Sequence, residues 1–157
     1  MLRQAKNNRG FTLIELVMVI VIVGIMAVAI IPKFGDLRSI GQDKFFDEVV
    51  AALRYGKELA VATGCQVRVN LTSGGYALQQ RSSCDTSSPF SVAVKNPGKE
   101  GDFQGTCPSG VTISPAQGII FGPLGNADFG SSSQYFTVTV GSQSLRIWAE
   151  SGYVELL

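Results

Sequence analysis

The 157-residue sequence predicts an α+β protein, in which one long N-terminal helix packs on an antiparallel β-sheet domain. Three observations lead to this prediction. Residues 16–31 contain no charged side chain. From residue 34 to residue 59, apolar residues recur at steps of three or four, which is the period of a helix buried along one face. Beyond Cys65 the period changes to two, and Gly, Ser and Pro divide the chain into short strands.

The first 31 residues have the layout of an export or anchoring signal. Residues 1–9 contain no acid and three bases, Arg3, Lys6 and Arg9. The apolar run over residues 11–31 would span about 32 Å as a helix, enough for a ~30 Å hydrocarbon core. A secretory signal peptide cut after Ala29 would explain this layout, and so would a plain single-span anchor. Neither explains Glu15.

Glu15 is the one charged residue within the apolar run. A carboxylate costs roughly 2.5–3.5 kcal/mol at the centre of a membrane helix and less near its end. A cut between Gly10 and Phe11 would create a free amine four residues from this carboxylate. The amine of one helix and the carboxylate of a neighbour would neutralise each other and fix the axial register of packed helices. We therefore expect Glu15 to act in filament assembly.

The segment Arg9-Gly10-Phe11-Thr12-Leu13-Ile14-Glu15-Leu16 resembles the leader and cleavage motif of type IV prepilins and type II secretion pseudopilins. The resemblance implies a leader peptide over residues 1–10, which a prepilin peptidase removes by cutting between Gly10 and Phe11. It also implies N-methylation of Phe11. Residues 11–31 would then form a transmembrane and assembly helix, in which Glu15 acts in subunit recruitment and docking.

The same resemblance implies partners and a location. The expected partners are other pilin or pseudopilin subunits, the prepilin peptidase and the bacterial inner membrane. The chain would cross that membrane once, with its β domain in the periplasm, and would later enter a pilus or pseudopilus.

Residues 32–64 are predicted to form the amphipathic half of the helix. Pro32 should kink or break the helix locally, and Gly64 is the expected C-terminal stop. Charged residues mostly occupy the faces away from the apolar stripe, so the stripe is expected to pack on a sheet. Its members are Phe34, Leu37, Gly41, Phe45, Val49, Ala52, Gly56 and Leu59.

Residues 65–157 are predicted to form the globular β domain. Alternating polarity predicts one hairpin from residues 66–71 and 76–80, and a second from residues 135–140 and 144–149. Shorter strands are expected over residues 90–94, 111–114, 118–121 and 153–156. Residues 82–110 are rich in Ser, Gly and Pro and should be mostly a long connection.

The three cysteines allow one intramolecular disulfide if the domain reaches an oxidising compartment. Pairing Cys84 with Cys107 is preferred, because it would close the loop between two predicted strand ends with an entropic gain of roughly 3–4 kcal/mol. Pairing Cys65 with Cys84 is the alternative, because these residues flank the first hairpin at nearly opposed positions. Three free, buried thiols are the remaining possibility.

Several kinds of chemistry are disfavoured by the composition. The chain has no His, which removes His-based triads and imidazole metal sites. The acids Asp85, Glu100, Asp102 and Asp128 fall in predicted loops and are expected to be solvated surface charges. Loss of residues 1–10 removes three bases and leaves ten against twelve acids, so nucleic-acid binding is not expected. We expect no catalytic residue, metal or cofactor, and therefore not an enzyme.

Residues 50–157 loosely resemble the GspH/FimT group of minor pilins and pseudopilins, and the Cys-bearing middle is most similar to minor pilins of the MSHA pilus. The leading hypothesis is therefore a minor pilin subunit of a type IV pilus-like filament. A minor pseudopilin of a type II secretion system is the alternative. A further alternative is an adhesive tip subunit that binds a ligand through residues 82–110. A secreted enzyme released after Ala29 fits the composition poorly.

Overall fold

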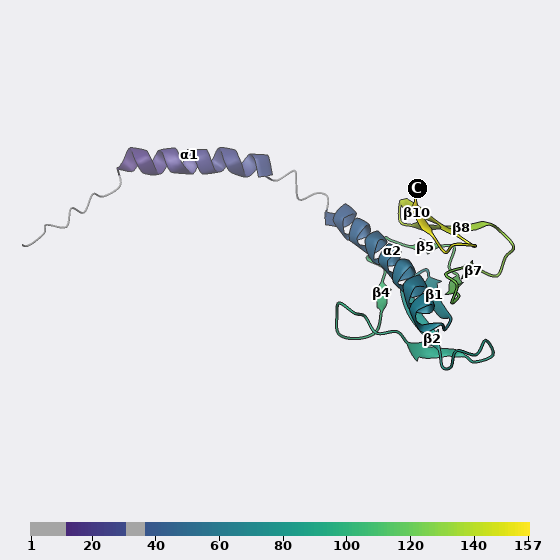
Figure 1. Ribbon diagram of the computed structural model, residues 1–157. Helices are drawn as coiled ribbons and strands as arrows, with labels where there is room; N and C mark the ends of the chain where they lie inside the picture. Colours follow the sequence, from purple (N-terminus) through teal and green to yellow (C-terminus); the bar gives the residue numbers. More distant parts are fainter. Residues whose placement is uncertain (1–11, 31–36) are drawn as a thin grey trace, which may run out of the picture. The chain divides into compact units, whose positions relative to one another are not determined.

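The computed structural model describes residues 12–30 and 37–157 (Figure 1). It divides into two compact units, Met1–Arg38 and Ser39–Leu157. The expected leader, its junction at Gly10 and Phe11, and Pro32 lie outside the described residues.

The first unit contains helix α1 (Leu13–Ile30). Glu15 is its one charged residue, and the apolar side chains around it are exposed on every face, from Leu13 (81%) to Met26 (64%). Over the residues that the structure describes, neither helix is both long and apolar enough to cross a membrane.

Helix α2 (Leu37–Thr63) supplies one side of the core of the second unit. Phe45, Val49 and Ala52 are buried, which confirms the predicted apolar stripe at these positions. At Gly56 the helix approaches the sheet so closely that an added Cβ would lie 2.8 Å from Cγ2 of Val69. The helix ends before Gly64, whose φ of 68° is the left-handed conformation of a helix C-terminus.

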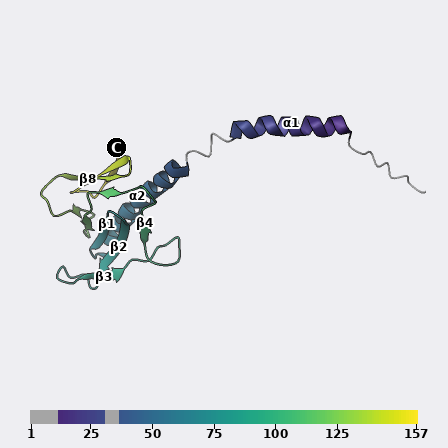
Figure 2. The same ribbon diagram turned by 180° about the vertical axis from the view of Figure 1, so that it is seen from behind.

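The first sheet has the strand order β3-β2-β1-β6-β7, and β4 also pairs with β2. Every pairing is antiparallel. Strands β3 and β4 share one edge of β2: β4 pairs with its first half and β3 with its second. Figure 2 shows β3 beside β2 from the opposite side. The strands are β1 (Val67–Thr72), β2 (Gly75–Arg81), β3 (Phe90–Ala93), β4 (Gln104–Thr106), β6 (Gly118–Phe121) and β7 (Ala127–Asp128).

The second sheet has the order β10-β9-β8-β5, again antiparallel. Its strands are β5 (Ile113–Ser114), β8 (Tyr135–Val140), β9 (Gln143–Trp148) and β10 (Val154–Leu156). Both predicted hairpins are confirmed, as are the short strands near residues 90, 113, 118 and 154. Strands β4 and β7 were not predicted from the sequence.

One hydrophobic cluster joins α2 to both sheets. Val67, Val69 and Leu71 project from β1 into this cluster, and Leu145 and Ile147 project from β9. The intervening residues of β1 and β9 therefore face outward. These two outer faces, the exposed side of α2 and the loops carry the polar side chains that remain available to partners.

Candidate functional site

Glu15 lies in the first turn of α1, and Thr12 caps that turn. The backbone N–H of Glu15 donates to the Thr12 carbonyl at 3.1 Å and to the Thr12 hydroxyl at 3.3 Å. Thr12 and Glu15 thus have the spacing of a capping box, in which a Thr N-cap is followed three residues later by Glu. This cap was not among the predicted features, although Thr-x-x-Glu before an apolar run is its sequence signature. The negative charge at this end also complements the helix dipole.

The disulfide joins Cys65 and Cys84, with their Cα atoms 4.5 Å apart, and Cys107 is a free thiol. The preferred pairing of Cys84 with Cys107 is therefore wrong, and the alternative is correct. The reason is the register of the first hairpin. Val67 pairs with Gln80, so Cys65 before β1 and Cys84 after β2 meet at the same end.

Cys107 lies at the other end of β2, where its N–H donates to the carbonyl of Gly74 at 2.9 Å. Strand β2 separates it from Cys84 by about 20 Å, since a strand rises about 3.3 Å per residue. Burial raises the pKa of the Cys107 thiol.

The outer face of the first sheet holds two arginines around one aromatic ring. The guanidinium carbon of Arg68 lies 4.7 Å from the centre of the Phe90 ring, and that of Arg81 lies 4.3 Å from it. Arg68 Nη2 donates to the Gln79 side chain at 2.7 Å. Arg81 Nε donates to the Gln66 side chain at 2.7 Å, and its Nη1 donates to the carbonyl of Ser88. We call Arg68, Arg81 and Phe90 the arginine patch.

Asp85 is the acid nearest in sequence to this patch, and it is hydrogen-bonded to Ser87. The two oxygens of Asp85 accept from the backbone N–H of Ser87 at 3.2 Å and from its hydroxyl at 2.5 Å. These bonds, with a smaller contribution from the charge of Arg81, lower the pKa of Asp85. Within the described residues, no carboxylate forms an ion pair with Arg68 or Arg81.

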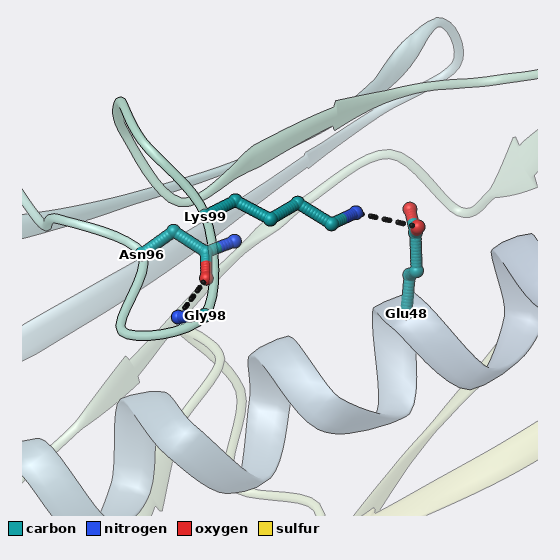
Figure 3. A network of polar contacts seen from close by, with 4 residues as sticks. All are labelled: Glu48, Asn96, Gly98 and Lys99. Carbon is teal, nitrogen blue, oxygen red and sulfur yellow. Dashed lines mark hydrogen bonds and ion pairs between the residues drawn. The ribbon is translucent and has the colours of Figure 1, made fainter.

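A second polar cluster lies where the connection between β3 and β4 meets α2 (Figure 3). Lys95 and Asp102 face each other in an antiparallel bridge and form an ion pair at 2.6 Å. Between them, the Asn96 side chain accepts from the N–H of Gly98 at 2.8 Å, and Lys99 forms an ion pair with Glu48 of α2 at 3.4 Å. We call residues 95–102 the charged hairpin, because they carry two lysines and two acids. Glu100 is exposed and has no ion-pair partner among the described residues.

A cavity of about 280 Å³ lies between the charged hairpin and α2. Tyr76 lies on its wall, and burial raises the pKa of this phenol to about 12, with a further contribution from the charge of Glu48. Phe103 closes the base of the hairpin by stacking on Tyr55, with ring centres 5.2 Å apart. The hairpin is thus held against the helix by both apolar and ionic contacts.

The outer face of the second sheet carries an aromatic cluster. Trp148 packs against Tyr135 with ring centres 5.6 Å apart, and its indole N–H donates to Glu155 at 3.2 Å. Arg146 lies over the Tyr135 ring at 4.5 Å and pairs with Glu155 at 3.5 Å. A cavity of about 230 Å³ beside Trp148 is also lined by Gln134, Glu150 and Ser151.

The remaining acids that were predicted to be surface charges, Asp102 and Asp128, do not form a common site. Asp128 accepts from the N–H of Gly130 at 2.8 Å, and Asp102 is used by Lys95. In the part of the chain that the structure describes, no three His, Cys, Asp or Glu side chains are placed to hold a metal ion.

The N-terminal segment matches a known family. Residues 5–31 match the family model of the prokaryotic N-terminal methylation motif. The chain is 35% identical over 89 residues to the type IV narrow pilus major component PilA5 of Thermus thermophilus. This alignment covers 53% of this chain and 77% of that protein.

Further similarities are found to two curated proteins and to one solved structure. Two fimbrial proteins of Pseudomonas aeruginosa are each 37% identical over 62 residues, covering 40% of this chain and 40% of each relative. Among solved structures, the minor pseudopilin EpsH of the type 2 secretion system of Vibrio cholerae aligns with a TM-score of 0.49 and 16% identity. That alignment covers 76% of this chain and 94% of EpsH.

The match to the Thermus pilus protein extends over more than two thirds of that relative, and the methylation motif covers the segment that carries Glu15. The chain therefore belongs to the type IV pilin and pseudopilin family.

Proposed function

We propose that this protein is a minor subunit of a type IV pilus-like filament and that it assembles through its N-terminal helix. The observation that carries the proposal is the methylation-motif match over residues 5–31, which includes both the expected cleavage junction and Glu15. The minor rank rests on the resemblance of residues 50–157 to GspH/FimT-type subunits. The curated relatives are a pilus component and two fimbrial proteins, which favours a pilus over a secretion machine.

In this proposal the chain has four parts. Residues 1–10 are a leader on the cytoplasmic side, where their basic residues hold it. Residues 11–31 anchor the subunit in the inner membrane and later pack in the filament. Residues 32–64 connect the anchor to the periplasmic domain as the amphipathic half of the helix. Residues 65–157 form that domain.

Glu15 gains its role only after cleavage. A prepilin peptidase cuts between Gly10 and Phe11 and the new N-terminus of Phe11 is methylated, which leaves a cationic amine one turn from Glu15. The exposed apolar side chains of α1 need lipid or sister helices to cover them. When two such helices pack, the Phe11 amine of one neutralises the Glu15 carboxylate of the other and selects one axial register.

The experiment is mass spectrometry of the chain recovered from its own bacterium, both from membranes and from filaments sheared off the cells. The proposal expects a mature chain that starts at a methylated Phe11 and is present in the sheared filaments. The variant Gly10→Ser should stay uncut in the membrane. An N-terminus at Ile30 would instead indicate a conventional secretory protein. A processed chain that is absent from pili, but required for export of other proteins, would indicate a type II pseudopilin.

A further inference from the structure

Three aromatic side chains form a row across the outer face of the second sheet. Tyr135 is opposite Trp148 in the register of β8 and β9, and their ring centres lie 5.6 Å apart. Tyr153 is opposite Trp148 on the other side, because the register of β9 and β10 continues to it and the Trp148 N–H donates to its carbonyl at 3.0 Å. Residues opposite each other on antiparallel strands project from the same face. Tyr135 and Tyr153 are 46% and 58% exposed, so a ligand can reach both. We call Tyr135, Trp148 and Tyr153 the aromatic row.

The cavity beside Trp148 adds polar groups to the aromatic row. Its volume of about 230 Å³ is below the ~300–1,000 Å³ of pockets for drug-sized molecules, so it suits one small ring. Gln134, Glu150 and Ser151 line it together with Trp148. Among the described residues, the side chains of Gln134 and Glu150 have no hydrogen-bond or ion-pair partner. The Ser151 hydroxyl accepts from the N–H of Tyr153 at 3.2 Å and can still donate its own proton. The cavity therefore combines an aromatic wall with unused hydrogen-bond donors and acceptors.

The charges around the aromatic row disfavour both anionic and cationic ligands. Glu150 lines the cavity, and Glu155 accepts from the Trp148 indole, so a phosphate or carboxylate would meet like charges there. Arg146 does not offset this repulsion, because it is paired with Glu155 at 3.5 Å. The Arg146 guanidinium also lies 4.5 Å from the centre of the Tyr135 ring and 5.9 Å from that of Trp148. A second cation on these rings would be repelled by the first. The site is therefore suited to an uncharged ligand.

We propose that the aromatic row and its cavity bind a chain of uncharged pyranose sugars. A pyranose ring has C–H groups on its faces and hydroxyls at its edge, so it matches an aromatic wall beside polar groups. Glu150 accepts from the sugar hydroxyls, and the Gln134 amide both donates to them and accepts from them. The aromatic row extends over two strand spacings, about 10 Å, which is longer than one pyranose ring. The site therefore takes a chain of sugars rather than one. This inference goes beyond the proposed filament role and does not depend on it.

The fluorescence of Trp148 tests the proposal directly, because it is the one tryptophan of the sequence and lies in the site. The full-length chain is kept in a polyoxyethylene detergent, which has no sugar headgroup. It is titrated with cellohexaose and with xylohexaose, two uncharged β-linked chains, and with glucose. At least one of the two chains should change the emission in a saturable way, and glucose should bind at least about tenfold more weakly. No change with either chain, or equal affinity for glucose, overturns the inference.

Substitutions at two exposed positions of the site supply the second test. Gln134→Ala removes the amide from the cavity, and Tyr153→Ala removes one ring from the aromatic row. Each should weaken binding of the hexasaccharide about tenfold or more. Both side chains are exposed, so the fold should be kept, and this is checked by thermal unfolding. Leu124→Ala is the matched control, because Leu124 is 92% exposed and lies outside the site. Unchanged affinity in both site variants, or an equal loss in the control, overturns the inference.

Other ligand classes that use aromatic surfaces are titrated in parallel. Hexagalacturonate, which carries a carboxylate on every ring, should bind at least about tenfold more weakly than the neutral chain. A single-stranded oligothymidylate and a proline-rich peptide test stacking of bases and docking of a polyproline helix. If any of these three binds more tightly than both neutral chains, the site belongs to that ligand and the inference is wrong. The proposed function is tested separately, because presence of the chain in sheared filaments does not depend on sugar binding.

Discussion

Removing the disulfide between Cys65 and Cys84 should destabilise the second unit by about 3 kcal/mol. The two cysteines are 19 residues apart in sequence, and opening a loop of that size returns about 3 kcal/mol of conformational entropy to the unfolded chain. For a unit of this size that loss lowers the melting temperature by about 10 °C. Because both thiols must be removed without leaving an unpaired one, the variant is Cys65→Ala with Cys84→Ala.

The assay is urea unfolding of the full-length chain in detergent micelles, followed by the fluorescence of Trp148, the one tryptophan of the sequence. Wild type in reducing buffer should match the double variant in oxidising buffer. The matched control is Cys107→Ala, which removes a thiol that forms no disulfide and should change the free energy of unfolding by less than about 1 kcal/mol. The reasoning is refuted if Cys107→Ala is as destabilising as the double variant, or if reduction leaves the unfolding midpoint where it was.

Three further predictions concern Glu15, the N-terminal limit of the folded unit and Tyr76. The Glu15→Leu variant should be cleaved and inserted normally but incorporated poorly into filaments. Glu15→Gln keeps a polar group in the first turn of the helix but loses the charge, so it should be incorporated just as poorly. Incorporation of either variant at the wild-type level would exclude pairing with the Phe11 amine. A fragment starting at Lys33 should be soluble in oxidising buffer and should be folded as judged by circular dichroism, because the core lies within residues 39–157. Aggregation of this fragment would contradict that placement of the core. The pKa of Tyr76 is about 12 in the folded state, against 10.0 when unfolded. The phenol therefore contributes to the free energy of unfolding below pH 10, and this contribution should be lost as the pH rises towards 12. Urea titrations of the wild type should give a lower free energy of unfolding at pH 11 than at pH 9. An equally large decrease in Tyr76→Phe would show that the buried phenol is not its cause.

Local patterns in the sequence were enough for the elements whose own residues determine them. The two hairpins alternate in polarity and have Gly at their turns, so β1, β2, β8 and β9 could be predicted without knowledge of their neighbours. Strand β4 could not be predicted in this way. Its three residues, Gln104 to Thr106, have no apolar alternation, and they are a strand because the edge of β2 pairs with them.

Long-range pairings explain why the candidate sites were harder to predict than the helices. The choice between Cys65 and Cys107 as the partner of Cys84 depends on the end of β2 at which each residue lies, and this follows from the register and not from the spacing. The arginine patch combines Arg68, Arg81 and Phe90 from three strands. Glu15 was different, because a lone charge in an apolar run is visible in the sequence itself.

The position of the disulfide also determines how the domain would carry mechanical load. Tension that reaches the domain through α2 arrives at Cys65, immediately beyond the end of the helix, and crosses the sulfur–sulfur bond to Cys84. Residues 66–83 lie outside this force path, since they form the loop that the bond closes. A pull that begins to separate α2 from the sheet therefore does not stretch β1 and β2. The hairpin that bears Arg68 and Arg81 would keep its register while the rest of the domain is strained.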